Sequence, residues 1–494
     1  MLSKLYDETD PLSIENYAKK LIGKTFNDVL KDYENDQYKL LINEEKEVYA
    51  VKHENKKRKG GLGDLIEECY FHYKCNNDSR PDFPYAGVEL KVTPYKINKK
   101  NSLSAKERLV ITMIDYFKIV EENFEDSHLF NKSKLILLIY YLFSKDIKSR
   151  LDYKINYVKL FTPPKEDLEI IKNDFKIIVD KIKNGKAHEL SEGDTMYLGA
   201  STKSASSNNK RRQPFSDELA KPRAFSFKCS YMTYVLNKYI AKDKTTYEPI
   251  IKDPNELKFT TFEEIIINKI NSYVGKTDKE LCKIFNKDYN NNKSQWIDLS
   301  YKMLGIKSNK AEEFEKANIT VKALRIDSKG KIVESSPLPS FKFKDIINES
   351  WEESKLFQYL DLEKFLFVVY KKEKDTYILK GAQIWHIPYE DLNVYVKAGW
   401  EDIKRIILDG VKLTPHNYKG KLIYKNNFPN KSANKVIHIR PHAQKSAYKL
   451  EDGKSIGNIS RDANELPDGR YMTNQSFWLN NTYILNQLDK NLIK

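Results

Sequence analysis

The chain has 494 residues, and 40% of them are hydrophobic, which gives enough apolar surface for sizeable cores and excludes wholesale disorder. At about 150 residues per domain, this length corresponds to roughly three domains or to two large ones. Lys and Arg (85) outnumber Asp and Glu (70), and the net charge of +15 favours a polyanionic partner such as nucleic acid, with ordinary solvated surface as the alternative.

Several classes of protein are not expected. No apolar run reaches the roughly 18 residues that a membrane-spanning helix needs, and the acidic N-terminal residues do not fit a secretory signal. The four cysteines form no CxxC pair and the eight histidines form no HExxH motif, so neither a disulfide framework nor zinc chemistry is expected. We therefore expect a protein of the reducing cytoplasm.

Helical patterns open the chain. Apolar residues recur at helical spacing over residues 14–30, and a second helical pattern, LGDLIEECYFHY, follows a basic stretch. A turn-rich break precedes an alternating run at residues 87–92, and the apolar run at residues 135–143 predicts a buried strand. Residues 201–216 read as a polar, basic loop, and residues 241–257 have the composition of a linker.

Two short patterns repeat with the same offset. IGKT at residues 22–25 returns as VGKT at residues 274–277, which separates Gly23 from Gly275 by 252 residues. AFSFKCSYM and SFWLNNTYI place Phe225 and Phe477 the same distance apart. The shared offset indicates a duplicated domain, and chance similarity between Lys-rich helices is the alternative.

The segment most suggestive of chemistry is RPDFPYAGVELKVTP, residues 80–94. Alternation along a strand puts Glu89 and Lys91 on one face, and the Pro and Gly before them allow a turn that brings Asp82 beside Glu89. Two carboxylates and a lysine suit Mg²⁺ and an attacking water. An exposed Glu–Lys ion pair on an edge strand is the alternative.

DFPYAGVELKVTP resembles the active-site segment of the MutH family of Mg²⁺-dependent endonucleases, within the PD-(D/E)XK nucleases. Further ordered matches extend the resemblance along the chain towards the two-copy, GATC-specific restriction endonucleases of the Sau-three-A type: KGGLGDLIE, SAKERLV, GKAHELSEG, RAFSFKCSYMT, IRPH and QSFWLNN. The resemblance implies an α/β protein with two tandem copies of the MutH-like restriction-endonuclease fold, each a mixed β-sheet flanked by helices. The expected domains are a catalytic domain at residues 1–245, a linker at 246–258 and a degenerate, DNA-binding domain at 259–494.

The resemblance also implies roles for individual residues of the first copy. Asp82, Glu89 and Lys91 match the family's D-x6-E-x-K catalytic set, with Asp82 and Glu89 as Mg²⁺ ligands. Glu67 matches a helix-borne glutamate that joins the metal site, and the Leu90 backbone carbonyl is expected to assist. Lys132, in SHLFNKSK, matches a lysine near the scissile phosphate.

DNA contacts are expected on loops of the same copy. Lys59 and Gly60 match a Lys-Gly pair on a DNA-contacting loop. Lys203 matches the lysine of the family's RPK element, although Ser201 and Thr202 stand where arginine and proline are usual. The resemblance further implies DNA contacts for Arg211, Arg212 and Lys228. Solvated surface lysines are the alternative for Lys59 and Lys203.

The second copy departs from the catalytic pattern. ANITVKALRI puts Thr320 opposite Glu89, while Lys322 still matches Lys91. The acids expected nearest to this position, Glu312 and Glu313, would be left without their partner. HIRPH nearby provides Arg440 and His442, a better match to the RPK element than the first copy has. We therefore expect a DNA-binding copy without catalysis and with a possible effector role, and a purely structural partner is the alternative.

The resemblance therefore predicts a type II restriction endonuclease that uses Mg²⁺ to cut double-stranded DNA at a short palindrome, GATC by resemblance. A nicking endonuclease of mismatch repair shares the motif, but its family members are about half this length. A non-catalytic DNA-binding regulator that kept the fold is the alternative from another class. We expect a monomer in solution, with a dimer or looped DNA as open alternatives for the bound state.

Overall fold

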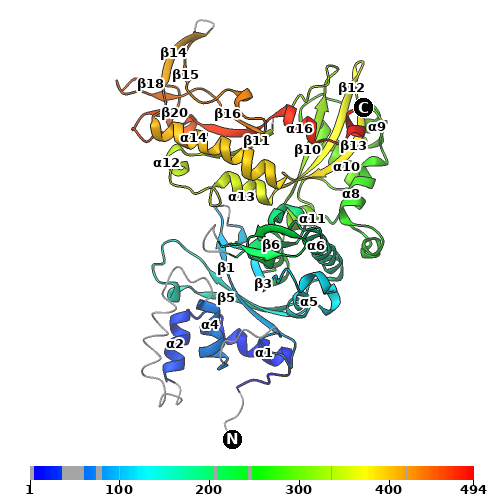
Figure 1. Cartoon of the computed structure of the whole chain (residues 1–494), viewed down its shortest axis with the longest axis vertical. Coiled ribbons are helices and arrows are strands. Elements are labelled where there is room, and N and C mark those ends of the chain that lie inside the picture. Colours follow the sequence, from blue (N-terminus) through cyan, green and yellow to red (C-terminus); the bar gives the residue numbers. More distant parts are fainter. Residues whose placement is uncertain are drawn as a thin grey trace. The chain divides into compact units, whose positions relative to one another are not determined.

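A computed structural model of the chain describes residues 5–35, 61–73, 80–99, 101–203, 209–242, 247–334, 336–418 and 421–494. It divides into two compact units: unit 1 comprises Met1–Thr261 and Glu312–Ala317, and unit 2 comprises Phe262–Ala311 and Asn318–Lys494. The boundary lies just after the linker expected at residues 246–258. Figure 1 labels the helices and strands and colours them from the N-terminus (blue) to the C-terminus (red). Among the described helices, none has both the length and the apolar character needed to cross a membrane.

The main sheet of unit 1 has the strand order β2-β1-β4-β5. Strand β1 (Glu89–Ile97) runs parallel to β4 (Ile136–Leu142), while β2 (Leu103–Ala105) and β5 (Ile155–Phe161) are antiparallel edge strands. The sequence of β4, ILLIYYL, is almost entirely buried, as expected for an inner strand covered on both faces. This confirms the buried strand predicted near Leu135.

Unit 1 has a second sheet with the order β3-β9-β6, and a separate β7–β8 hairpin. Both neighbours of the central strand β9 are antiparallel to it. The bounds of these strands are β3 (Leu109–Met113), β6 (Leu198–Thr202), β7 (Arg211–Gln213), β8 (Ser216–Ala220) and β9 (Arg223–Phe227).

Seven helices belong to the described part of unit 1: α1 (Pro11–Ala18), α2 (Phe26–Asn35), α4 (Gly61–Leu65), α5 (His128–Ser133), α6 (Lys165–Lys183), α7 (Cys229–Val235) and α11 (Glu312–Ala317). Helices α1, α2 and α4 share a core with β1, β4 and β5. Helix α6 buries Ile171, Phe175, Ile178 and Ile182 along one face at helical spacing. It ends before Gly185, whose φ of +70° suits glycine.

Helix α11 lies between unit 2 elements in sequence but packs in unit 1. The buried Lys316 ammonium forms ion pairs with Asp167 (2.6 Å) and Glu312 (2.8 Å). Burial opposes the ammonium form, but these two carboxylates outweigh it and raise the pKa of Lys316. Glu313 accepts hydrogen bonds from the amides of Ile250 and Ile251. Part of the expected linker is therefore a fixed, buried segment of unit 1.

Unit 2 repeats both strand orders. In its first sheet, β10 (Ile319–Ile326) runs parallel to β12 (Lys364–Glu373), which pairs antiparallel with β13 (Thr376–Trp385). In its second sheet, β11 (Ser336–Phe341) and β16 (Ile437–Pro441) both pair antiparallel with β21 (Gln475–Leu479). These arrangements match β1-β4-β5 and β3-β9-β6 of unit 1 in order and in direction.

Both sequence repeats lie on corresponding elements. The Gly23 amide donates to the Ile155 carbonyl on β5 at 2.8 Å, and the Gly275 amide donates to the Leu379 carbonyl on β13 at 3.0 Å. Both glycines have positive φ, +93° and +85°, so each turn depends on glycine. Phe225 and Phe477 lie on β9 and β21, the central strands of the two second sheets.

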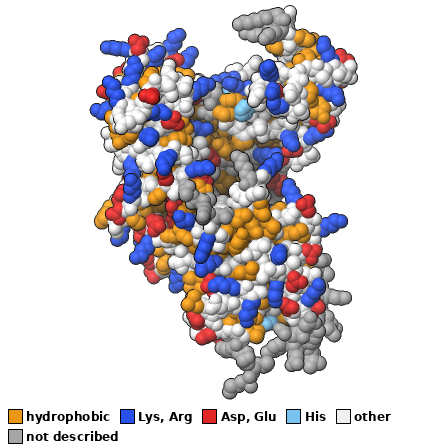
Figure 2. All heavy atoms as spheres, turned by 180° about the vertical axis from the view of Figure 1, so that it is seen from behind, with side chains coloured by type: hydrophobic (Ala, Val, Ile, Leu, Met, Phe, Trp, Pro, Cys, Tyr) orange, Lys and Arg blue, Asp and Glu red, His pale blue; other side chains and the backbone are white. Residues whose placement is uncertain are grey.

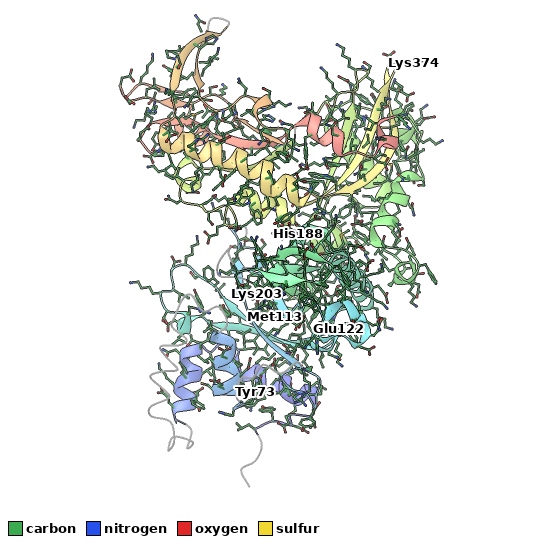
Figure 3. The ribbon with its side chains drawn as sticks, in the orientation of Figure 1. Tyr73, Met113, Glu122, His188, Lys203 and Lys374 are labelled. Atoms are coloured by element: carbon green, nitrogen blue, oxygen red, sulfur yellow. The ribbon has the colours of Figure 1, made fainter. Side chains whose placement is uncertain are left out.

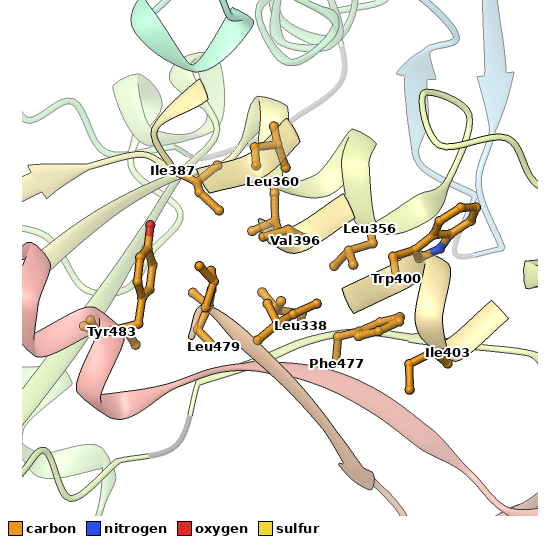
Figure 4. Close-up of a cluster of buried hydrophobic side chains, with 14 of the residues drawn as sticks. Leu338, Leu356, Leu360, Ile387, Val396, Trp400, Ile403, Phe477, Leu479 and Tyr483 are labelled. Carbon is orange, nitrogen blue, oxygen red and sulfur yellow. The ribbon is translucent and has the colours of Figure 1, made fainter. Parts of the chain in front are cut away.

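The rest of unit 2 surrounds these sheets. A core formed by α13, α14, β11 and β21 packs Trp400 and Ile403 near Phe477, with Leu338 and Leu356 beside them (Figure 4). The helices are α8 (Phe262–Asn271), α9 (Asp278–Ile284), α10 (Ser294–Leu304), α12 (Phe343–Ile346), α13 (Lys355–Leu362), α14 (Lys397–Asp409), α15 (Ile459–Asp462), α16 (Asn481–Gln487) and α17 (Lys490–Ile493). The remaining strands are β14 (Leu413–Tyr418), β15 (Lys421–Asn426), β17 (Tyr448–Lys449), β18 (Ser455–Ile456), β19 (Ala463–Glu465) and β20 (Tyr471–Thr473).

Candidate active site

A tight turn at the start of β1 brings two carboxylates together. Phe83 and Val88 pair across the turn through two backbone hydrogen bonds of 2.9 and 3.2 Å, and Gly87 has a φ of +65°. Asp82 and Glu89 flank this pair and are therefore neighbours across the turn. The Asp82 carboxylate accepts the Leu90 amide at 2.8 Å, which fixes it at the beginning of β1. The turn expected from the sequence is present.

Glu89 is the buried centre of the cluster, with 1% of its side chain exposed. Its Oε1 lies 2.5 Å from Lys91 Nζ, and its two oxygens lie 3.3 and 3.2 Å from Lys132 Nζ. The two lysine side chains are 22% and 12% exposed, so each retains some contact with solvent. A buried carboxylate needs such partners, because an unpaired charge in the interior is costly.

Lys132 reaches Glu89 because α5 leads directly into β4. The Ser127 hydroxyl caps α5 by accepting the Phe130 amide at 3.1 Å, and the helix ends at Ser133, three residues before β4 begins. Since β1 and β4 are parallel, with Glu89 in register with Ile136, both strands begin at the same edge of the sheet. Lys132 was matched loosely from sequence, and the structure groups it with Asp82, Glu89 and Lys91.

The electrostatics of the cluster favour an added cation. Burial, and secondarily the neighbouring Glu89 carboxylate, raises the pKa of Asp82, although Lys91, Lys132 and the Leu90 amide oppose the shift. A divalent cation between Asp82 and Glu89 would remove the repulsion between them. Both groups offer oxygen atoms, the ligand type that Mg²⁺ prefers.

The protein's share of such a metal site is two carboxylates. Within the described residues there is no group of three or more His, Cys, Asp or Glu side chains able to hold a metal ion. Glu67 lies in the π-helical turn Ile66–Tyr70, is partly buried, and is not grouped with Asp82 and Glu89. The donors present fit Mg²⁺, which usually keeps several waters and takes only one or two protein carboxylates.

The expected DNA contacts of unit 1 have different outcomes. Lys203 is exposed just after β6, and Figure 3 labels it near Met113, the last residue of β3. Arg211 and Arg212 are exposed on β7, where they can reach a ligand. Lys59 and Gly60 lie outside the described residues.

Lys228 does not fit a DNA contact. Its side chain is 1% exposed, its ammonium donates to the Thr195 carbonyl, and its charge faces the buried Asp174 carboxylate. A lysine in this position stabilises the interior and cannot reach a phosphate, so the expectation for Lys228 was wrong. The RAFSFK pattern gave no sign of this, because lysines near strand ends are usually solvated.

A similar arrangement in unit 2 has no carboxylate at the positions of Asp82 and Glu89. The Val321 amide donates to Asn309 Oδ1 at 3.1 Å, as the Leu90 amide does to Asp82. Thr320 precedes this amide as Glu89 precedes that of Leu90, and Thr320 lies in register with Phe365 on β12 as Glu89 lies in register with Ile136 on β4. Asn318, with a φ of +55°, takes the place of Gly87. An amide and a hydroxyl therefore stand where unit 1 has carboxylates.

A different acid, Glu363, occupies the second site. It accepts hydrogen bonds from the Thr320 hydroxyl and from Asn318 Nδ2, the latter at 2.7 Å. Burial raises the pKa of Glu363, and burial also lowers the pKa of the neighbouring Lys322. Glu312 and Glu313, expected from sequence to be the nearest acids, instead belong to α11 of unit 1, so that expectation was wrong.

The RPK-like element of unit 2 lies on β16 and is exposed. Arg440 lies opposite Ser476 in the register of β16 and β21. Its guanidinium lies over the Trp478 ring, 4.1 Å from the ring centroid. His442 Nδ1 lies 2.8 Å from the Ser476 hydroxyl, and its ring meets Trp478 edge-on. Arg440 pairs with the residue before Phe477 on β21, and Ser201 of β6 pairs with the residue before Phe225 on β9. Arg440 therefore holds the position of Ser201, as the sequence comparison of the two halves predicted.

The chain is similar to two proteins of known function and to one family model. The chain is 38% identical over 459 residues to the type II restriction enzyme Sau3AI of Staphylococcus aureus, covering 88% of this chain and 93% of that enzyme. It is 26% identical over 198 residues to the DNA mismatch repair protein MutH of Vibrio parahaemolyticus, covering 38% of this chain and 81% of that protein. The family model of the DNA mismatch repair enzyme MutH matches residues 71–174, which include Asp82, Glu89, Lys91 and Lys132.

Proposed function

Because this chain belongs to the MutH-like type II restriction endonucleases, we propose that it cuts double-stranded DNA at GATC with Mg²⁺ bound at Asp82 and Glu89. Membership of the family makes the protein a DNA-binding, site-specific deoxyribonuclease. The metal, the active-site residues and the recognition sequence are the proposal. The recognition sequence is supported by the resemblance to the two-copy, GATC-specific enzymes.

One observation carries the proposal for the active site. Asp82, Glu89, Lys91 and Lys132 gather at one edge of the sheet. The Glu89 carboxylate contacts both ammonium groups, and Asp82 lies close enough to interact electrostatically with all three. A structural ion pair needs only one cation for the buried Glu89, and the second lysine remains available for an anionic substrate. Hydrolysis of a phosphodiester requires this combination of metal ligands and positive charge.

Each residue has a distinct role in the proposal. Mg²⁺ would supply Lewis acidity and lower the pKa of a bound water. Asp82, Glu89 and the Leu90 carbonyl would hold the ion, with Glu67 as a further candidate through a water. Lys91 would orient the attacking water, and Lys132 would offset the charge that develops on the scissile phosphate.

We further propose that the units are tandem copies of one fold and that unit 2 binds DNA without cutting it. The repeated strand orders and the paired Gly23 and Gly275 turns support duplication. Asn309 and Thr320 cannot supply the negative charge that a metal site needs, which supports loss of catalysis. The exposed Arg440 and His442, together with Lys203, Arg211 and Arg212 of unit 1, are the proposed DNA contacts.

A mismatch-repair nicking activity is the second candidate. The match to MutH favours it, but that match covers 38% of this chain, whereas the restriction enzyme matches 88%. Digestion of a supercoiled plasmid with and without Mg²⁺, followed by sequencing of the ends, tests both candidates. Our proposal predicts Mg²⁺-dependent linear fragments with ends at GATC. Nicked circles alone would favour the second candidate, and an unchanged plasmid would favour a non-catalytic regulator.

A further inference from the structure

One stretch of unit 2 contains no acidic residue. Between Asp409 and Glu451 the chain has nine Lys or Arg residues and three His, and no Asp or Glu. At the average acid content of the chain, a stretch of this length would carry about six. We call residues 410–450 the acid-free segment. It contains the β14–β15 hairpin and continues to β16, which carries Arg440.

The hairpin has two different faces. Directly opposite residues of an antiparallel pair point to the same side, so Thr414, Lys425, His416 and Ile423 share one face. The opposite face carries Leu413 and Tyr424, and both pack against the core of unit 2. Lys412 and Lys425 are exposed, and neither forms an ion pair within the described part of the chain. The hairpin therefore presents cations on the side away from its anchor.

The base of the hairpin is firmly held. The Tyr448 hydroxyl donates to the Tyr424 carbonyl at 3.3 Å, and the two rings lie 5.1 Å apart. The Lys412 amide donates to Asn427 Oδ1 at 2.9 Å, and Arg470 donates to the Val411 carbonyl at 2.6 Å. An arm fixed in this way loses little conformational entropy when it binds.

Between α6 and β6, a stretch that the structure describes in full, unit 1 has no such hairpin. The equivalent stretch between α6 and β6 is short and includes Glu189, Glu192 and Asp194. From residue 195 to residue 216, unit 1 also has no Asp or Glu, and this stretch includes β6. The acid-free segment of unit 2 includes β16. DNA contacts are proposed on or next to both strands. In unit 2 the hairpin therefore extends a basic region that both units share. Figure 2 shows Lys and Arg side chains distributed over one face of this unit.

We propose that the β14–β15 hairpin is an arm that binds the phosphate backbone of double-stranded DNA without reading its sequence. Lysines are point charges that suit phosphates, and the described side chains of the exposed face include no Arg, Asn or Gln, the residues that typically make paired contacts to base edges. The inference rests on DNA as the partner, which follows from the family, and does not depend on the active-site assignment.

The same unit offers a matched control. The β12–β13 hairpin also projects from unit 2, at the other end of the unit, and Figure 3 labels Lys374 at its tip. It carries acids as well as lysines, since Glu373 and Asp375 flank Lys374 and Glu373 forms an ion pair with Lys380 at 2.8 Å. These carboxylates offset part of the positive charge of the hairpin, so it should contribute less to DNA binding than the acid-free segment does.

The test compares two charge-matched double variants of the full chain, Lys412→Gln/Lys425→Gln and Lys372→Gln/Lys374→Gln. Binding to duplexes with and without GATC is measured in EDTA over a range of salt concentrations. Each phosphate contact contributes about 0.9 to the slope of log K against log salt, so the arm variant should lower the slope by about 1.8 on both duplexes. The control variant should leave the slope near that of wild type.

Three results would overturn the proposal: an unchanged slope in the arm variant, equal effects of the two variants, or a loss confined to the GATC duplex. The four lysines are at least partly exposed, so thermal unfolding midpoints should match wild type and exclude misfolding as a cause. Cleavage at saturating DNA is measured separately. If the wild-type protein binds DNA but does not cut it, the proposed function is wrong. The proposal for the arm is still tested in that case by the salt slopes of the two variants.

Discussion

Asn309 in unit 2 occupies the position of Asp82 in unit 1. Asp82 accepts a hydrogen bond from the amide of Leu90, the residue after Glu89, at 2.8 Å. Asn309 accepts one from the amide of Val321, the residue after Thr320, at 3.1 Å. The exchange of an acid for an amide keeps the hydrogen bond that orders the strand and removes the charge that a metal requires. The hydrogen bond is thus common to both units and the charge is present in unit 1 alone. Our proposal assigns catalysis to unit 1 on this basis, and the following predictions test it.

Lys132 should be required for rate and much less for binding. Replacement by Met in Lys132→Met removes a cation from the proposed phosphate position and should lower the cleavage rate constant by about 100-fold or more. Lys134→Met is the matched control, because Lys134 is exposed two residues further on and its ammonium donates to Asn131 rather than to Glu89. Single-turnover cleavage measures both. Equal rates for the two variants would contradict the role of Lys132.

Cleavage should fall at acidic pH, and Mg²⁺ should counteract the fall. Burial and Glu89 raise the pKa of Asp82, so the carboxylate takes up a proton at a higher pH than an ordinary aspartate. The protonated form cannot hold the ion, and activity should therefore be lost as pH falls through this raised pKa. Because Mg²⁺ competes with the proton, a higher Mg²⁺ concentration should move the acid limb to lower pH. An acid limb independent of Mg²⁺ would contradict this linkage.

Lys228 should stabilise the fold and make no contribution to DNA affinity. Lys228→Met leaves the Asp174 carboxylate buried without its cation and should lower the free energy of unfolding by about 3–5 kcal/mol. Urea denaturation measures the loss, and DNA binding is compared at a temperature where the variant remains folded. A stable variant with weakened DNA binding would restore the original assignment.

Arg440 should contribute to recognition of the cognate site. If it contacts a base, Arg440→Ala should weaken binding to GATC DNA by about 1–3 kcal/mol and have a smaller effect on other DNA. A phosphate contact would instead weaken both equally and lower the salt slope by about one. Arg405→Ala, an exposed arginine on α14 paired with Asp402, is the control. No difference between the two variants would leave unit 2 as a structural partner.

Much of the first site was predictable because its signals are local. Alternation along β1 and a seven-residue separation closed by one turn were enough to bring Asp82 beside Glu89. Lys132 lies 43 residues from Glu89 and joins the site only through the parallel pairing of β1 and β4. The resemblance supplied that residue, since spacing alone carries no sign of it.

The second site was less accessible from sequence. Asn309 precedes Thr320 by eleven residues, and α11 lies between them, so the spacing of the first copy is lost. Glu363 comes from the residue before β12, and no pattern near Thr320 points to it. The packing of α11 in unit 1 depends on the buried Lys316, which sequence treats as an ordinary surface lysine.

Single-turnover plasmid cleavage by Glu89→Gln and Thr320→Val, with Mg²⁺ and saturating enzyme, tests the central claim most directly. These substitutions change the residue before the amide that donates to Asp82 in unit 1 and to Asn309 in unit 2. The account predicts that Glu89→Gln binds DNA and does not cut it, while Thr320→Val cuts within a few-fold of the wild-type rate. Near wild-type cleavage by Glu89→Gln, or loss of cleavage in a folded, DNA-binding Thr320→Val, would contradict the assignment of catalysis to unit 1.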